Sequence, residues 1–186
     1  LLTTVDAATV TASFDVATSV ASIVSVANAT PAVAGTTTAL TATTDTAVGG
    51  AGADIFNSVI QAAGVTGSTI APGDTISGGE GVDTLAISVA GALASAAYTL
   101  SAVSTTDVEK VLLSNFDTNN TNANIIDASL MTGVTHVGLS SSSIEGDTTF
   151  DSVKNLVAAE MNNGGANLTL TYATAVVAGT ADAQTL

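Results

Sequence analysis

The amino-acid sequence predicts an all-β fold, a parallel β-solenoid or β-roll in which short strands stack along the chain. Three observations indicate this fold. Two glycine- and aspartate-rich turns have the same internal spacing, and short apolar runs recur through the C-terminal half. In addition, 46% of the residues are hydrophobic but only 3% are aromatic. A core of Val, Ile, Leu and Ala suits the thin, regular layers of a solenoid better than a bulky globule.

Residues 1–40 form an Ala-, Thr- and Val-rich lead-in segment. The apolar residues between Val16 and Ala27 are spaced so that they would share one face of a helix. Asp15 would cap that helix, and Pro31 lies beyond its end. Many of these apolar residues are β-branched, however, and such residues favour strands. A minor helical segment and a strand are therefore equally compatible with this part of the sequence.

Residues 41–88 contain one pattern twice. DTAVGGAGADIF begins at Asp45 and DTISGGEGVDTL begins at Asp74, and six of their twelve positions are identical. In each copy a glycine-rich stretch precedes a second acid, Asp54 or Asp83, nine residues after the first. This is the period of the nonapeptide GGxGxDxUx, in which a tight turn leads into a short strand with one inward apolar residue. The glycines of the two turns are Gly49, Gly50, Gly52, Gly78, Gly79 and Gly81.

The identity of the repeated residues predicts a calcium site. Glycine readily takes the backbone angles that fold a tight turn, and such a turn points its carbonyl groups inward. Aspartate adds charged oxygen, and Ca²⁺ takes about 6–8 oxygen ligands from carbonyls and carboxylates alike. One turn cannot supply so many ligands, so we expect the paired turns to bind Ca²⁺ through the four aspartates and six glycines named above. The alternative is that the two glycine turns bind no ion.

The charge balance excludes some classes of partner. Lys110 and Lys154 are the two basic residues, against 16 acidic ones, and the net charge is −14 at pH 7. Such a chain cannot neutralise the phosphates of a nucleic acid or bind an anionic membrane surface. No apolar run approaches the roughly 18 residues of a membrane span, so we expect no membrane insertion. Excess carboxylate suits a hard cation, although acidity alone also keeps an apolar chain soluble.

Residues 89–186 are expected to form further rungs of the solenoid. The intervals between successive apolar runs are irregular, which fits a solenoid with loops of variable length. The Asn-rich stretch at 119–129 is expected at a corner, because Asn tolerates positive φ. An antiparallel sandwich of short strands is the alternative fold. The apolar runs are 108–113, 134–139, 153–158 and 168–173, and residues 58–63 fit either a helical turn or a strand.

Several other polar residues are candidates for functional groups. His136 is the single histidine, and without a second His or a Cys it supports neither a typical zinc site nor a serine triad. Glu109 follows the second glycine turn and is either an additional calcium ligand or a solvated strand residue. Glu145, Asp147 and Asp151 lack EF-hand spacing and form a solvated loop or a weak ion site. With so few aromatic residues to line a sugar cleft, we expect no enzyme.

These motifs resemble the RTX-type surface-layer (S-layer) proteins of Gram-negative bacteria. The resemblance rests on D-x-x-x-G-G-x-G-x-D-x-[LF], on APGDTISGGEGVDTL and on DVEKVLLSNF, and it covers residues 40–115 well and the remainder loosely. In that family the glycine stretch leads into β-strands, often with an N-x-E-x-[VI] motif. Residues 107–111 stand at this place, with Asp107 where Asn is usual and Glu109 as the glutamate.

The resemblance implies a secreted, calcium-dependent protein that assembles with copies of itself into a lattice on the cell surface. Cell-surface glycan or lipopolysaccharide is a second implied partner. The alternative within this resemblance is a calcium-dependent adhesin or glycan-binding module of a large RTX protein. The chain begins at Leu1 and ends within its own pattern, so we expect it to be a segment of a longer polypeptide.

Overall fold

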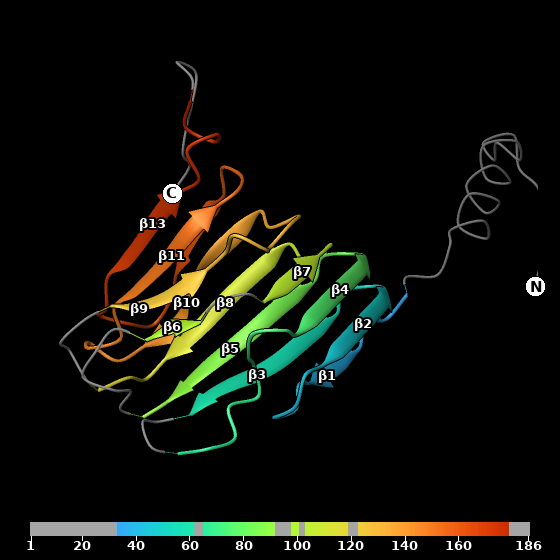
Figure 1. Ribbon diagram of the computed structural model, residues 1–186, viewed down its shortest axis with the longest axis horizontal. Helices are drawn as coiled ribbons and strands as arrows, with labels where there is room; N and C mark the ends of the chain where they lie inside the picture. Colours follow the sequence, from blue (N-terminus) through green and yellow to red (C-terminus); the bar gives the residue numbers. More distant parts are fainter. Residues whose placement is uncertain (1–32, 62–64, 92–97, 101–102, 119–122, 179–186) are drawn as a thin grey trace, which may run out of the picture. The chain divides into compact units, whose positions relative to one another are not determined.

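The computed structural model describes residues 33–61, 65–91, 98–100, 103–118 and 123–178, so the helix or strand predicted between Val16 and Ala27 lies outside the described part. Every regular element in the described part is a β-strand, and all the strand pairs are parallel. The strands wind into a solenoid of about four turns (Figure 1). The prediction of an all-β parallel solenoid is confirmed, and the alternative of an antiparallel sandwich is wrong.

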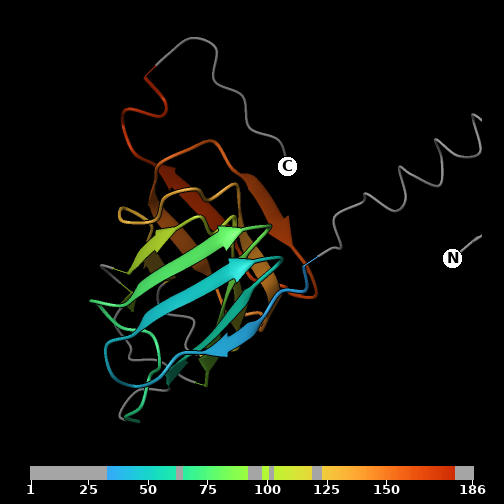
Figure 2. The ribbon, with the colours of Figure 1, turned by 90° about the vertical axis from the view of Figure 1, so that its right-hand side faces the viewer.

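Three sheets form the walls of the solenoid (Figures 1 and 2). The six-stranded sheet contains, in spatial order, β1 (Thr37–Ala39), β3 (Ile55–Gln61), β5 (Thr84–Ala90), β8 (Lys110–Asn115), β10 (His136–Ser142) and β12 (Ala158–Met161). The three-stranded sheet contains β2 (Thr46–Ala51), β4 (Thr75–Glu80) and β7 (Ser104–Thr106). The four-stranded sheet contains β13 (Leu168–Tyr172), β11 (Thr148–Val153), β9 (Asn124–Asp127) and β6 (Thr99–Leu100). The six-stranded sheet therefore continues from the first described strand almost to the last. The three-stranded sheet belongs to the earlier coils and the four-stranded sheet to the later ones.

The length of one coil varies along the solenoid. In the six-stranded sheet Thr37 pairs with Ile55, and Ile55 in turn pairs with Thr84. The coil from Thr37 to Ile55 has the length of two nonapeptides. The coil from Ile55 to Thr84 is much longer, and so are those that follow it to Lys110 and His136. Only the first described coil therefore has the length of a regular repeat, and the later ones contain additional loop.

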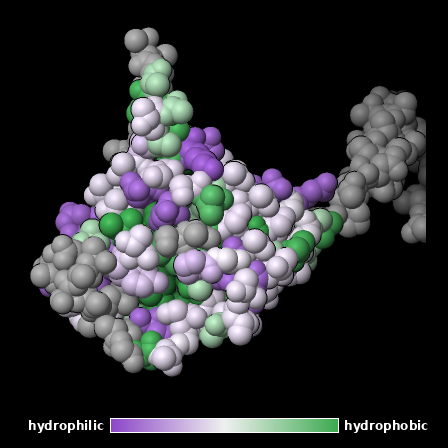
Figure 3. Space-filling model, in the orientation of Figure 1, coloured by the Kyte–Doolittle hydropathy of each residue, from purple (hydrophilic) through white to green (hydrophobic). Residues whose placement is uncertain are grey.

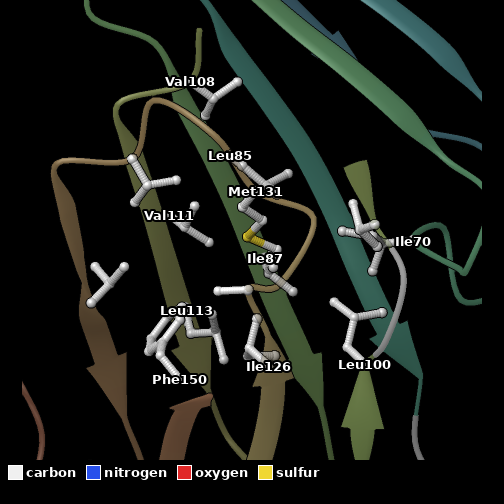
Figure 4. Packing of buried hydrophobic residues seen from close by; sticks show 14 of the residues in the cluster. Ile70, Leu85, Ile87, Leu100, Val108, Val111, Leu113, Ile126, Met131 and Phe150 are labelled. Atoms are coloured by element: carbon white, nitrogen blue, oxygen red, sulfur yellow. The ribbon is translucent and has the colours of Figure 1, made fainter. Parts of the chain in front are cut away.

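The core consists of rows of apolar side chains that stack in register. Phe56, Leu85, Val111 and Val137 follow one another across β3, β5, β8 and β10, and each is at most 1% exposed. Figure 4 shows Leu85 and Val111 in the same interior as Phe150 of the four-stranded sheet. Successive side chains of a strand point to opposite faces, and every second residue of β3, β5 and β8 is buried. In β10 the small residue Gly138 is buried as well, between Val137 and Leu139. Phe56 and Leu85 are the apolar residues that follow the two glycine turns, and they point inward as predicted.

The outer faces of the strands carry mostly small polar residues. On the face seen in Figure 3, hydrophobic residues form small patches between polar and intermediate ones. Large exposed hydrophobics such as Val48 and Ile144 lie far apart in the sequence and in different coils. Scattered exposure of this kind is normal for a folded chain.

Most predicted strands are confirmed, and two expectations are wrong. The apolar runs 108–113, 134–139 and 168–173 overlap β8, β10 and β13. The run 153–158 instead spans a corner, because Val153 ends β11, Ala158 begins β12, and the residues between them include three exposed ones. Of the Asn-rich stretch predicted at a corner, residues 119–122 lie outside the described part. The prediction is wrong for Asn124–Asp127, which form β9 with Asn124 and Ile126 pointing inward.

Candidate metal site

The candidate site lies at the corner where the three-stranded sheet turns into the six-stranded sheet. Here the two glycine turns join β2 to β3 and β4 to β5, and they stack in register, with Gly50 paired to Gly79. Both glycines have positive φ, 122° and 100°, in the region that favours glycine. A Cβ on Gly79 would also collide with the carbonyl group of Gly50. The sequence signal of repeated glycines therefore has a direct cause, since a side chain here would prevent the stacking of the coils.

The structure brings the acids together across coils rather than within one motif. Asp45 lies beside Asp74, and Asp54 lies beside Asp83, each pair 29 residues apart. The six-residue strand β2 separates Asp45 from Asp54, so the two acids of one motif lie beyond opposite ends of this strand. Two columns of acids result, an Asp45 column at the start of β2 and β4 and an Asp54 column at the end of the glycine turns.

In the Asp45 column every carboxylate oxygen accepts a hydrogen bond. The Asp45 N–H donates to Asp74 Oδ1 at 2.9 Å, and the Ala71 N–H donates to Asp74 Oδ2 at 2.8 Å. The N–H and hydroxyl of Thr41 donate to the two oxygens of Asp45 at 2.7 and 2.9 Å. This column is therefore satisfied by the protein itself, and its carboxylates act as caps for main-chain N–H groups.

In the Asp54 column one oxygen of each aspartate remains without a donor. The Asp54 N–H donates to Asp83 Oδ1 at 2.7 Å, and the Asp83 N–H donates to Glu109 Oε2 at 2.8 Å. Asp54 Oδ1 accepts from the N–H and hydroxyl of Thr36 at 2.5 and 2.6 Å. Asp54 Oδ2 and Asp83 Oδ2, by contrast, are buried and accept no hydrogen bond. Both side chains are almost fully buried, at 1% and 0% exposure, so bulk solvent does not reach the two oxygens.

The two unpartnered oxygens have equivalent surroundings, one coil apart. A Cβ on Gly49 would meet Asp54 Oδ2 and the carbonyl oxygen of Gly78. A Cβ on Gly78 would meet Asp83 Oδ2 and the carbonyl oxygen of Asp107. Each carboxylate oxygen therefore lies near a main-chain carbonyl oxygen of the next coil, and both groups are hydrogen-bond acceptors. A proton or a cation between the two acceptors would compensate them. Gly49 and Gly78 leave the space beside each carboxylate oxygen that a Cβ would fill.

Asp107 is a part of this corner that the residue pattern did not single out as a ligand. It follows β7, whose Ser104 pairs with Thr75 of β4, and its φ of 51° is left-handed, as for the turn glycines before it. Asp tolerates this conformation better than most residues, so an Asp just before a predicted strand was the sequence feature that could have indicated a turn here. Thr84 pairs with Lys110, so Glu109 occupies the position that Asp83 holds one coil earlier, and its Oε2 accepts from the Asp83 N–H. Glu109 therefore lies at the end of the Asp54 column.

The electrostatics of the column disfavour ionised Asp83. Burial raises the pKa of the Asp83 carboxyl above the ordinary value of an aspartate, and the negative charges of Glu109, Asp54 and Asp107 raise it further. The hydrogen bond from the Asp54 N–H acts in the opposite direction on this pKa but is outweighed. A positive charge at this place would stabilise the ionised form.

A cation here would be held by both carboxylate and backbone oxygen. Among the residues that the structure describes, no three or more His, Cys, Asp or Glu side chains converge into a metal-binding group. The donors at each equivalent position are one carboxylate oxygen and one main-chain carbonyl oxygen of the next coil, and Ca²⁺ accepts both kinds of ligand. The residues present therefore fit a calcium ion better than zinc, which takes nitrogen and sulfur ligands.

The other candidate polar residues lie elsewhere. His136 begins β10, and its Nδ1 is hydrogen-bonded to the hydroxyl of Thr135 at 2.9 Å. Asp147 Oδ1 accepts from the Asn167 N–H at 2.7 Å, and Asp151 Oδ2 accepts from the Ser152 hydroxyl at 3.0 Å. His136, Asp147 and Asp151 therefore have hydrogen-bond partners, whereas Glu145 Oε2 of the same acidic group is buried and accepts no hydrogen bond.

Comparisons with protein-family models, with curated proteins and with solved structures find no match for this chain. Within the described ranges, no helix is long and apolar enough to cross a membrane. The geometry of the corner therefore carries the functional argument.

Proposed function

We propose that the chain is a structural segment of a secreted bacterial surface-layer protein, in which Ca²⁺ at the Asp54 column stiffens the solenoid and promotes self-assembly. The observation that carries this proposal is the pair of buried oxygens, Asp54 Oδ2 and Asp83 Oδ2, each without a donor and near a carbonyl oxygen of the next coil. The resemblance of residues 40–115 to RTX-type surface-layer proteins supports the same conclusion.

The energetic argument starts from the cost of burying an unpaired charge. A buried carboxylate without a compensating partner costs several kcal/mol, so it takes up a proton or pairs with a cation. Near neutral pH a cation is the better solution when oxygen ligands surround the position. Asp54 with the Gly78 carbonyl, and Asp83 with the Asp107 carbonyl, would hold such ions. A bound Ca²⁺ would supply the positive charge that these stacked acceptors lack.

Because extracellular calcium sites bind weakly, a calcium site at this corner would be filled only after export. Extracellular modules bind Ca²⁺ with Kd values of roughly 10⁻⁴–10⁻³ M, so they are filled outside the cell and empty inside. In a chain of net charge −14, empty sites leave the carboxylates repelling one another. The segment would then become rigid and assemble after it leaves the cell.

Calcium titration tests the proposal. In the presence of EDTA we expect a lower Tm and a weaker β-sheet circular dichroism signal than at millimolar Ca²⁺, with Mg²⁺ as a less effective control. Light scattering should rise with Ca²⁺ as copies associate. A Tm that is the same in EDTA and in millimolar Ca²⁺ would contradict the proposal.

Two substitutions separate the two acid columns. Asp54→Asn should abolish most of the calcium-dependent rise in Tm, because Asp54 Oδ2 is one of the unpartnered oxygens. Asp45→Asn is the matched control, since both oxygens of Asp45 accept hydrogen bonds from Thr41. This control should keep the full response to Ca²⁺. An equal loss of response in both variants would assign the ion to a place other than the Asp54 column.

One observation favours a second candidate function, the calcium-dependent glycan-binding module. The outer face of the three-stranded sheet has a shallow hollow of about 180 Å³, whose lining is mainly apolar with a few hydroxyl groups. Neutral hydroxyls suit the hydrogen bonds of a saccharide. A saccharide-dependent rise in Tm, with the chain remaining monomeric at millimolar Ca²⁺, would favour this function over the structural one. The hydroxyl-bearing residues are Thr46, Thr75, Ser77, Ser104 and Thr106.

A further inference from the structure

The corner between β12 and β13 contains the single Asn-Gly dipeptide of the chain, Asn163 and Gly164. Met161 ends β12 and Leu168 begins β13, so the dipeptide lies in the loop that connects them. Both residues of the dipeptide are exposed, so water has access to them. Because glycine has no side chain, its main-chain nitrogen is open to approach by the side-chain amide of the asparagine before it.

Neither of the two groups that could react is engaged elsewhere. The side-chain amide of Asn163 and the main-chain N–H of Gly164 form no hydrogen bond with another described residue. The neighbouring Asn162 differs, since its Nδ2 donates to Glu160 Oε1. The Asn163 amide is therefore free to rotate toward the Gly164 nitrogen, whereas the Asn162 amide is held.

The fold has its own reason for each residue of the dipeptide. A Cβ on Gly164 would collide with the hydroxyl oxygen of Ser142, so this position needs glycine. Asn163 has a φ of 44°, in the left-handed region, which Asn tolerates better than most residues. The Ser142 N–H also donates to the Asn163 carbonyl at 3.3 Å, which ties the corner to the end of β10. The packing that selects this dipeptide therefore also places a reactive pair of groups at the surface.

We propose that Asn163 is a site of spontaneous deamidation in the folded chain. Asparagine is among the chemically labile residues of proteins. The Gly164 nitrogen attacks Asn163 Cγ and gives up its proton, the bond from Cγ to the side-chain nitrogen breaks, and ammonia leaves. Water then opens the cyclic imide at either of its carbonyl groups. The sum is an amide and water converted into a carboxylic acid and ammonia, without oxidation or reduction, and position 163 becomes aspartate or isoaspartate.

The two products change the corner in different ways. Aspartate keeps the main chain and adds a negative charge near Glu160, in a chain whose net charge is already −14. Isoaspartate takes the main chain through the former side chain, so the connection from β12 to β13 becomes longer by a methylene group. The hydrogen bond from the Ser142 N–H to the Asn163 carbonyl is then lost, and β13 should open more easily. This inference does not rest on the proposed calcium role.

Peptide mass spectrometry of aged protein tests the inference. The chain is incubated in mildly alkaline buffer, once folded and once unfolded in urea, and cleavage after Glu160 then releases the peptide that begins at Met161. In the folded sample, the mass change from amide to acid should accumulate at Asn163 before any other described asparagine. Asn162 is the internal control, because its amide is bound to Glu160. Fragmentation by electron transfer should identify isoaspartate at position 163.

Asn163→Gly is the matched variant, because glycine keeps the left-handed conformation and has no amide. Hydrogen exchange of β13 should become faster as the wild-type chain ages and stay constant in the variant. An Asn163 that reacts in urea but stays intact in the folded sample would overturn the inference. Earlier reaction of another described asparagine in the folded sample would also do so. Equal acceleration of β13 exchange in both aged proteins would overturn the effect assigned to this corner.

Discussion

The four aspartates of the glycine motifs occupy similar places in the sequence but have different chemistry in the folded chain. Asp45 and Asp74 have a donor for each carboxylate oxygen, whereas Asp54 and Asp83 each keep one buried oxygen without a donor. The motif therefore contains one acid that caps the main chain and one that is available to a cation. Nine-residue spacing alone does not distinguish these two roles.

Asp83→Asn should stabilise the calcium-free protein and remove the pH dependence of its stability that comes from Asp83. Because the pKa of Asp83 is raised in the folded state, ionising it weakens the fold. The free energy of unfolding in EDTA should then be highest at acidic pH and fall as the pH rises through that pKa. Asparagine keeps an oxygen for the Asp54 N–H and places an N–H₂ group near the Asp107 carbonyl.

Urea denaturation in EDTA at several pH values measures this effect. We expect a gain of about 1 kcal/mol at pH 7, the net value of a typical hydrogen bond. In millimolar Ca²⁺ the order should reverse, with the wild type the more stable protein. A variant less stable than the wild type in EDTA at pH 7 would contradict this account.

At the scale of elements, each strand of the six-stranded sheet is held by an inward row of side chains that spans several coils. Leu85 of β5 lies between Phe56 and Val111 in the row and is fully buried. The glycine turn just before it also contains an apolar residue, Val82, which is 53% exposed. Hydrophobicity alone does not separate these two positions, but the alternation of the strand does.

Leu85→Ala should lower the free energy of unfolding by about 2–5 kcal/mol, because it leaves a cavity in a packed row. Val82→Ala, the control in the same turn–strand unit, should change it by no more than about 0.5 kcal/mol. Denaturant unfolding in saturating Ca²⁺ measures both. Similar losses in the two variants would indicate that the Leu85 row is not continuous in solution.

At the scale of the whole molecule, the solenoid is a stack in which each coil contacts its neighbours. Within the described part, the most extensive contacts between elements are those between adjacent strands of the three sheets. The corner with the Asp54 column involves the first coils, from β2 to β8, whereas β11 lies one coil beyond β8 and β13 two coils beyond it. In such a quasi-one-dimensional fold, the effect of a local change decays with distance along the stack.

Removal of Ca²⁺ should therefore loosen one part of the solenoid more than the other. Amide hydrogen exchange followed by mass spectrometry should show faster exchange in EDTA for peptides of β2 to β5. Peptides of β11 should change little, because local opening is confined to the coils that lose the ion. Equal acceleration in both regions would show that the described solenoid opens as a single cooperative unit.

Much of the fold could be predicted because it follows from local rules. Glycines at Gly50 and Gly79 need left-handed backbone angles, and alternating apolar residues such as Phe56 and Leu85 need an interior. The run 153–158 shows the limit of this reasoning, since an apolar stretch can cover a corner when Val153 and Val157 are buried on either side of it. Hydrophobic content alone does not show where a strand ends.

By itself the sequence determined the all-β class, the two glycine turns, the inward residues that follow them and the excess of carboxylate. Only the tertiary structure decided that Asp54 meets Asp83, that Asp83 in turn meets Glu109, and that Asp107 closes the corner. The physical reason is that register between coils depends on the number of residues in each coil, here 29 between Asp54 and Asp83. That number includes loops whose lengths follow no local rule, so the partners across coils emerge only when the whole chain is wound.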